Sequence, residues 1–212
     1  MIKMERKTVA GNIRNAERSR EKFLDAVAKI VSESGFAALG INHIAEVAGL
    51  GKKMIYTYFG GLEELIEEYL KRQDFWQGVG EQALPDTMKD GGRNLSREMV
   101  LEHFDYVNRN REFQKILIWG LADGRPSFRQ MSERMEDSGE RIFGQMTDPF
   151  FGENARKFRA VMAVLIAGSY YLNLHGSFNG APFCGIDLTS ASGRKEIEEA
   201  LSLMVDQSYE AL

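Results

Sequence analysis

The sequence predicts an all-α protein. Apolar residues recur at the i, i+3, i+4, i+7 spacing of a helix in each long segment. No run of four to eight residues alternates between apolar and polar, as a half-buried strand would. Glycine and proline stand between the periodic segments, where they end helices and form turns. We therefore expect helices joined by turns, with no sheet and no internal repeat.

The composition is that of one large or two small soluble globular domains. The chain has 212 residues, of which 43% are hydrophobic and 27% are charged. The best candidate for a membrane span, residues 161–174, is shorter than the roughly 18 residues that a span needs. The N-terminus lacks the apolar block of a secretory signal, and one cysteine, Cys184, allows no internal disulfide. These features predict a cytoplasmic protein with no membrane partner.

Positive charge is concentrated at the N-terminal end. Residues 1–60 contain ten Lys or Arg and six Asp or Glu, a net charge of +4, whereas the rest of the chain carries −8. A basic region on an acidic body is typical of a protein whose basic part binds a polyanion. Chance scatter explains the same numbers equally well, so the motifs must decide between the two interpretations.

The N-terminal quarter divides into a basic arm and a small helical domain. We expect residues 1–14 to form a flexible basic arm, and Asn15 to be the N-cap of the first helix. Helices are expected at 15–34, 41–48 and 52–58. Glycines follow each of them closely and mark their ends. The expected N-terminal domain is residues 15–61.

A longer helical domain, residues 62–212, is expected to follow. Its first helix, 62–76, has two glutamates in its first turn, where the helix dipole favours acidic side chains. Further helices are expected at 95–109, 112–122, 128–146, 154–175 and 193–212.

Two short helices around Gly49 have the composition of a helix-turn-helix. Gly49 supplies the positive φ that ends a helix abruptly, and the small Ala45 lets a second helix cross close to the first. Ile55 gives the inward direction of the second helix, so Lys53 and Thr57 should point outward. In this arrangement the second helix enters the major groove of DNA.

The outward face of the second helix carries ammonium and hydroxyl groups, which can donate hydrogen bonds to phosphates and base edges. The candidate DNA-binding residues are Asn42, Lys52, Lys53, Met54, Tyr56, Thr57 and Tyr58. The alternative is that the tyrosines pack inside the domain while the lysines are only solvated. For the tyrosines both interpretations can hold, with the ring against protein and the hydroxyl toward DNA.

The stretch SREKFLDAVAKIVSESGFAALGINHIAEVAGLGKKMIYTYFGGLEELI, residues 19–66, resembles the N-terminal domain of the TetR family of bacterial transcriptional regulators. The shared features are the Ser-Gly-Phe after the first helix, Ile44-Ala45, Ala48-Gly49-Leu50, Ile55-Tyr56, Tyr58-Phe59 and Glu63-Glu64-Leu65. The resemblance implies a three-helix helix-turn-helix DNA-binding domain, a linking fourth helix and an all-helical domain for ligand binding and dimerisation. It further implies a homodimeric repressor that binds a palindromic operator in double-stranded DNA and is released by a small-molecule effector.

Three positions depart from the family's pattern. Gly40 and Gly51 stand where the family has hydroxyl residues that cap helices, and Leu62 replaces a lysine that contacts the DNA backbone. Each lost phosphate contact lowers the affinity for DNA and its dependence on salt. The alternative function is therefore a helical dimeric sensing or interaction module whose DNA-binding head has degenerated.

The penultimate of the expected helices is apolar nearly all round, and the last carries an apolar stripe at helical spacing, which indicates cover on more than one side. The resemblance implies that these two helices pair with a second copy as a four-helix bundle, whereas packing within one monomeric core is the alternative. The candidate dimer-interface residues are Ala160, Ala163, Ala167, Gly168, Ile197, Leu201, Met204 and Val205.

Aromatic and methionine side chains with a few polar tips recur on the C-terminal helices, as in a cavity for a largely apolar small molecule. The candidate effector-binding residues are His103, Phe104, Val107, Trp119, Phe128, Met131, Met135, Tyr171 and His175. An ordinary hydrophobic core has the same pattern. We find no catalytic set, phosphate loop, cofactor motif or metal-ligand spacing, so we expect neither an enzyme nor a cofactor.

Overall fold

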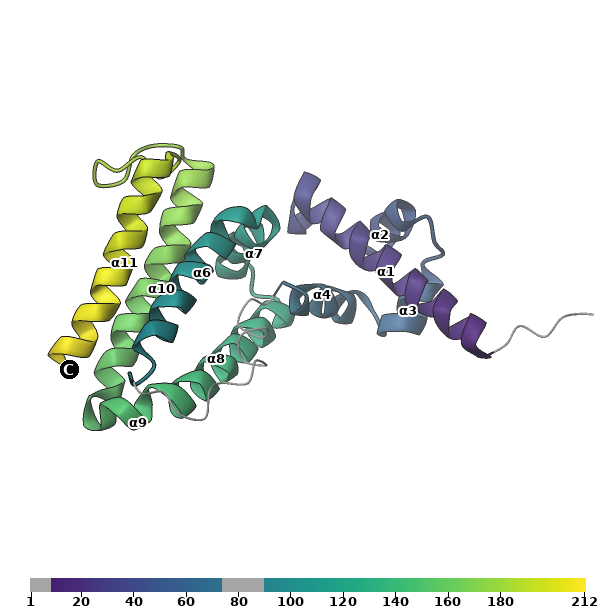
Figure 1. Cartoon of the computed structure of the whole chain (residues 1–212). Coiled ribbons are helices and arrows are strands. Elements are labelled where there is room, and N and C mark those ends of the chain that lie inside the picture. The colour runs from purple at the N-terminus through teal and green to yellow at the C-terminus, as the bar shows by residue number, and fades with distance from the viewer. Residues whose placement is uncertain (1–8, 74–89) are drawn as a thin grey trace, which may run out of the picture. The chain divides into compact units, whose positions relative to one another are not determined.

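A computed structural model describes residues 9–73 and 90–212. Every regular element in these ranges is a helix, and one isolated bridge pairs Phe183 with Ile186 (Figure 1). The predicted all-α fold is confirmed. None of the described helices combines the length and the apolar character that crossing a membrane requires.

The chain forms two compact units. Unit 1 comprises the described residues up to Gln73 together with Trp119–Met131, and unit 2 comprises the other described residues. Helices α7 (Arg111–Ala122) and α8 (Pro126–Met146) each have one end in each unit.

Unit 1 also contains four complete helices and one 3-10 turn. They are α1 (Val9–Ser34), η1 (Phe36–Ala38), α2 (Ile41–Ala48), α3 (Lys53–Phe59) and α4 (Leu62–Lys71). The predicted N-cap at Asn15 was wrong, because α1 is already helical from Val9 and Asn15 lies inside it, where its carbonyl accepts a bond from Ser19. Of the predicted basic arm, residues 1–8 lie outside the described residues, and the remainder belongs to α1.

Phe36 is the centre of the unit 1 core. It is fully buried, and its ring centroid lies 6.3 Å from that of Tyr69 on α4, 6.3 Å from that of Trp119 and 5.1 Å from that of Phe128. The buried face of α4 therefore packs on the same core as α1. The sequence placed residues 62–212 in one domain, whereas the structure groups α4 with the N-terminal helices. As a functional boundary, residue 62 stays a prediction.

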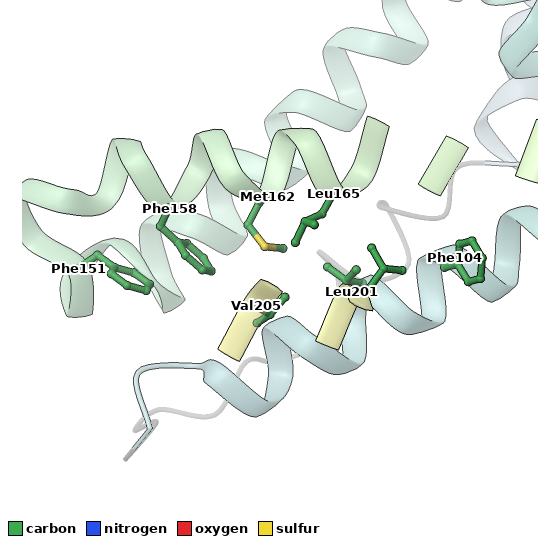
Figure 2. Close-up of a cluster of buried hydrophobic side chains, with 8 residues drawn as sticks. Phe104, Phe151, Phe158, Met162, Leu165, Leu201 and Val205 are labelled. Carbon is green, nitrogen blue, oxygen red and sulfur yellow. The ribbon is translucent and has the colours of Figure 1, made fainter. Parts of the chain in front are cut away.

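Unit 2 is built on three long helices that pack side by side. Its elements, besides parts of α7 and α8, are α6 (Arg93–Arg109), α9 (Asp148–Phe151), η2 (Gly152–Asn154), α10 (Ala155–Phe178) and α11 (Ala191–Ala211). Buried side chains from α6, α9, α10 and α11 form one hydrophobic cluster (Figure 2), in which Phe151 stacks on Phe158 with 4.3 Å between ring centroids. Burial of this cluster holds α6 against α10 and α11.

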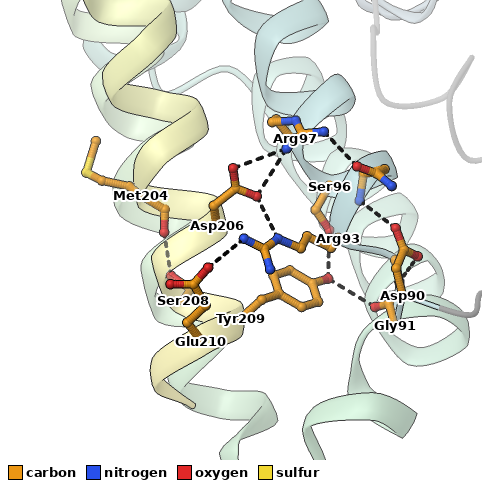
Figure 3. A network of polar contacts seen from close by, with 12 residues as sticks. Asp90, Gly91, Arg93, Ser96, Arg97, Met204, Asp206, Ser208, Tyr209 and Glu210 are labelled. Carbon is orange, nitrogen blue, oxygen red and sulfur yellow. Dashed lines mark hydrogen bonds and ion pairs between the residues drawn. The ribbon is translucent and has the colours of Figure 1, made fainter.

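A polar network fixes the start of α6 to the end of α11 (Figure 3). Asp206 accepts hydrogen bonds from Arg93 Nε at 2.7 Å and from Arg97 Nη1 at 3.1 Å. Both arginines favour the ionised carboxylate, so they lower the pKa of Asp206, the bond from Arg93 having the larger effect. The Tyr209 hydroxyl donates to the Gly91 carbonyl at 3.0 Å. These contacts fix the alignment of α11 along α6.

Candidate DNA-binding and effector sites

The turn between α2 and α3 has the geometry that the sequence predicted. Gly49 ends α2 in the left-handed conformation, with φ 65° and ψ 31°, and its N–H points at the carbonyls of Ala45 and Glu46. Leu50 N–H donates to the same Ala45 carbonyl at 3.0 Å. A Cβ at Gly49 would meet no atom within 4 Å, so glycine is needed here for its φ and not for space.

The side of α3 opposite the core is exposed. Ile55 is fully buried, whereas Lys53, Tyr56 and Thr57 are exposed, Tyr56 by 55%. Thr57 Oγ1 donates to the Lys53 carbonyl at 3.1 Å, which leaves the hydroxyl oxygen able to accept a further bond. The alternative was that the tyrosines pack inside the domain while the lysines are only solvated. This alternative does not hold for Tyr56, because Tyr56 is exposed.

The remaining candidate DNA-binding residues lie around this face. Asn42 on α2 is exposed and accepts a hydrogen bond from Lys52 Nζ at 3.3 Å, so the two helices present these side chains together. Met54 and Tyr58 are half-buried at its edges. The structure thus brings the seven predicted residues onto one end of unit 1, and their contact with DNA stays a prediction.

Arg20 of α1 anchors α3 from behind, a role that the sequence reasoning missed. Its guanidinium donates to the Tyr58 carbonyl and to Glu68 of α4, and lies 4.5 Å from the centroid of the Phe59 ring. Phe59 in turn meets Phe23 edge to face at 6.1 Å. No local spacing links residue 20 to residues 58–68, so only the packed fold reveals this contact.

Unit 2 contains an apolar cavity of about 450 Å³ between α6, α8 and α10. Its lining is rich in methionine and contains a few polar residues. The lining residues are Ser96, Met99, Ser132, Met135, Glu136, Gly139, Ile142, Phe143, Met146, Arg159, Met162, Ala163, Ile166, Ala167 and Tyr170. Methionine is flexible and polarisable, so such a wall can adapt to an apolar ligand.

Of the predicted effector-binding residues, only Met135 lines this cavity, and effector binding by the whole set stays a prediction. Phe104 and Val107 are buried, and Phe104 belongs to the hydrophobic cluster of unit 2. Tyr171 is 54% exposed and meets His175, which packs on Phe183 of the following loop. The helical periodicity predicts which residues share a face of one helix. It does not predict which faces of different helices pack together.

Three more of the predicted effector-binding residues belong to unit 1. Trp119 and Phe128 pack on Phe36, and Met131 is also buried in that unit. They belong to the hydrophobic core of unit 1, and the sequence pattern did not predict that this core contains Phe36.

His103 is buried between α6 and α10 and does not line the cavity. Its ring meets the ring of Tyr170, a lining residue, with 4.8 Å between centroids. Burial disfavours the charged imidazolium and lowers the pKa of His103 to about 3, so the ring is neutral at physiological pH.

The outer face of α10 and α11 exposes apolar side chains. Val164 is 70% exposed, Leu203 55% and Met204 41%, and the predicted interface residue Ala160 is exposed with them. Ala163 and Ala167 are also exposed, and both line the methionine-rich cavity. Gly168 and Ile197 are half-buried.

Two of the predicted interface residues do not lie on the surface. Leu201 and Val205 are 3% and 0% exposed, because their side of α11 packs in the hydrophobic cluster with Phe158 and Leu165 of α10. The large exposed apolar residues of α11 are Leu203, which was not predicted, and Met204, which was.

Residues 23–69 match the family model of bacterial regulatory proteins of the tetR family. The matched segment is similar to the N-terminal DNA-binding domain of TetR-family regulators. The matched residues contain the C-terminal part of α1, all of α2 and α3 and most of α4, which is the described part of unit 1 that carries the helix-turn-helix.

A curated TetR-type relative is the HTH-type transcriptional repressor NicS of Pseudomonas putida, which is 34% identical over 102 residues. The match covers 48% of this chain, and the chain spans about half the length of NicS, 48%.

Solved TetR-type structures share the fold over most of both chains. A TetR family regulator from Marinobacter aquaeolei has a TM-score of 0.61 and 19% identity, over 91% of this chain and 96% of that chain. FadR of Bacillus subtilis, solved in complex with stearoyl-CoA, has a TM-score of 0.57 and 14% identity, over 86% of this chain and 97% of that chain. At these identities the likeness shows the fold alone.

The departures from the TetR-family pattern have visible consequences. The N-termini of α2, α3 and α4 have no side-chain cap, since Gly40, Lys52 and Gly61 stand at the cap positions. A Cβ at Gly40 or at Gly51 would meet no atom within 4 Å, so neither glycine is required for space.

Proposed function

We propose that this chain is a TetR-family DNA-binding transcriptional repressor that acts as a homodimer in the bacterial cytoplasm and is released from a palindromic operator by a small apolar molecule. The observation that carries the proposal is the exposed face of α3. It presents Lys53, Tyr56 and Thr57 on a helix that Ile55 and Phe59 hold from the other side.

The chemistry of this face suits duplex DNA. The two ammonium groups of Lys52 and Lys53 neutralise phosphates, and the hydroxyl of Tyr56 can donate to a phosphate or base edge. A helix of this kind fits the major groove, and a two-fold dimer presents two of them to half-sites about 34–36 Å apart. The repressor function of NicS supports repression as the outcome.

The partner for dimerisation is a second copy that covers the outer face of α10 and α11. A 70% exposed Val164 and a 55% exposed Leu203 are unusual on a water-facing surface when small residues lie beside them. The exposed Ala160 lets the helices of another copy approach closely. Sedimentation of wild type should give a dimer, and Val164→Asp should give a monomer, whereas Ser192→Asp, exposed at the start of α11, should leave the dimer intact.

The effector is expected in the methionine-lined cavity of unit 2, whose volume suits a small apolar molecule. The probe 1-anilinonaphthalene-8-sulfonate should fluoresce when it binds wild type. Met135→Trp fills the cavity and should weaken probe binding about tenfold or more, whereas Leu121→Trp, on an 89% exposed position, should not. Equal probe binding by all three proteins would place the effector elsewhere.

DNA binding is tested by fluorescence anisotropy with the intergenic DNA upstream of the gene. Wild type should bind, and Lys53→Ala and Tyr56→Ala should each weaken binding about tenfold. Lys29→Ala removes the same charge from an exposed position on α1 and should bind like wild type. If the two α3 variants also bind like wild type, α3 is not the recognition helix.

A second candidate function is a dimeric sensing module with a degenerate DNA-binding head. The observation that favours it is the absence of side-chain caps at the N-termini of α2, α3 and α4. Anisotropy that stays unchanged at low ionic strength, or binding that shows no dependence on salt, would support this function over the first.

A further inference from the structure

We propose that unit 2 has a second ligand site, a polar pocket of about 190 Å³ in which Arg111 and Arg194 bind a small oxyanion, a carboxylate or phosphate group. This site goes beyond the proposed regulatory function. Its residues come from the end of α6, the start of α7, the end of α10, the segment before α11 and the start of α11, and none of them lines the methionine-rich cavity.

The Arg194 guanidinium is held in place by neutral groups. Its Nη1 donates to Asn173 Oδ1 at 3.0 Å, and its plane lies over the Phe104 ring at 4.5 Å from the centroid. Asn173 is itself fixed, since its Nδ2 donates to the carbonyls of Phe104 at 2.9 Å and Ser169 at 2.8 Å. The guanidinium is therefore oriented before any ligand binds, which lowers the entropy lost on binding.

Arg194 has a positive charge that no bonded carboxylate balances. Within the described residues it forms no ion pair, and its Nη2 is buried with no hydrogen-bond partner. Burial lowers the pKa of Arg194, and the more distant charges of Glu198 and Asp105 oppose this effect only in part. A partly buried cation without an anion loses hydration that a bound oxyanion would replace.

Arg111 supplies a second guanidinium at the exposed side of the pocket. Its Nη1 donates to Gln114 Oε1 at 3.2 Å and to the Ser177 carbonyl at 3.3 Å, and the group lies 6.0 Å from the centroid of the Phe178 ring. Among the described residues it too has no carboxylate partner. Asn108, which also lines the pocket, adds an amide donor.

The other arginines of unit 2 show what is unusual here. Arg93 and Arg97 share Asp206, and Arg159 is bonded to Asp148. The two arginines of the polar pocket are instead placed together without an acid between them. The planar fork of a guanidinium matches the two oxygens of a carboxylate or phosphate, and a volume of several waters accommodates such a group.

Isothermal titration with inorganic phosphate and, separately, with acetate, at constant ionic strength in chloride, tests the site. Wild type should bind at least one of the two saturably. Arg194→Gln and Arg111→Gln should each weaken binding about tenfold or more, because each removes charge-assisted hydrogen bonds. Arg194→Lys, which keeps the charge but not the fork, should bind with intermediate affinity. Binding of phosphate alone or of acetate alone identifies the ligand group.

Two controls separate this site from the others. Arg156→Gln and Lys29→Ala each remove an exposed basic side chain outside the pocket, on α10 and α1, and both variants should titrate like wild type. Arg111 is exposed, so its variant should fold even if Arg194→Gln does not, which far-UV circular dichroism will show. The proposal is overturned if wild type binds neither anion, or if Arg111→Gln binds like wild type.

Discussion

The two units differ in how closely function follows the local sequence. In unit 1 the candidate DNA-binding residues lie within 17 consecutive positions, from Asn42 to Tyr58, and the helix period alone predicts which of them face outward. In unit 2 the cavity is assembled from three separate helices, whose residues span positions 93–178. The local sequence pattern thus predicts a surface whose residues lie in one short motif. It does not predict a cavity, because a cavity depends on how separate helices pack.

The largest change in stability is expected from a substitution in the core of unit 1, where residues distant in the sequence are in contact. Phe36→Ala removes the ring that meets Tyr69, Trp119 and Phe128 and should destabilise unit 1 by about 3–5 kcal/mol. Urea unfolding followed by tryptophan fluorescence measures this loss. Leu121→Ala, at an 89% exposed position, should change stability by no more than about 0.5 kcal/mol. Equal effects of the two variants would remove Phe36 from the centre of this core.

The next largest effect is the dependence of stability on pH that the buried His103 of unit 2 should cause. The pKa of His103 is lowered to about 3 by burial, against about 6.5 in an unfolded chain. Between these values the unfolded chain binds a proton that the folded protein does not, so stability falls as the pH falls below 6.5. From pH 8 to pH 5 this residue should account for a loss of about 2 kcal/mol. His103→Gln should lose correspondingly less over the same range in urea unfolding; an unchanged pH dependence would contradict a buried neutral imidazole.

These contrasts explain how far the sequence could predict the structure. The period and the glycines gave the all-α fold, the outward face of α3 and helix ends mostly within two or three residues. They could not show that Trp119 packs on Phe36, or that Leu201 faces the core while Leu203 faces water. On an amphipathic helix several apolar stripes are possible neighbours of a core, and only the packing of the other helices selects one of them.

A smaller effect is expected at the turn of unit 1. Gly49→Ala places a Cβ at φ 65°, which should destabilise the protein by about 1–2 kcal/mol although no atom lies in the way. Thermal unfolding should show the loss, and DNA binding should weaken with it if the turn sets the angle of α3. Retention of wild-type stability would mean that the left-handed turn is not required.

The smallest effect has the opposite sign. The Gly51 carbonyl already accepts a hydrogen bond from Met54 N–H at 2.9 Å, so Gly51→Ser places a hydroxyl beside the first turn of α3, one residue before Lys52 and at a position where a Cβ meets nothing. It should raise the unfolding free energy by about 0.5–1 kcal/mol. Gly51→Ala lacks the hydroxyl and serves as its control in the same urea titration. A gain from both substitutions alike would show that backbone entropy, and not capping, is responsible.

The central claim is that the outward face of α3 contacts the phosphates and bases of a duplex. The salt dependence of DNA binding tests this claim most directly. The logarithm of the wild-type association constant should fall linearly with the logarithm of salt concentration. Lys53→Ala should reduce the slope by about one, and Lys29→Ala should leave it unchanged. Equal slopes for Lys53→Ala and wild type, or a wild-type affinity that does not change with salt, would contradict the account.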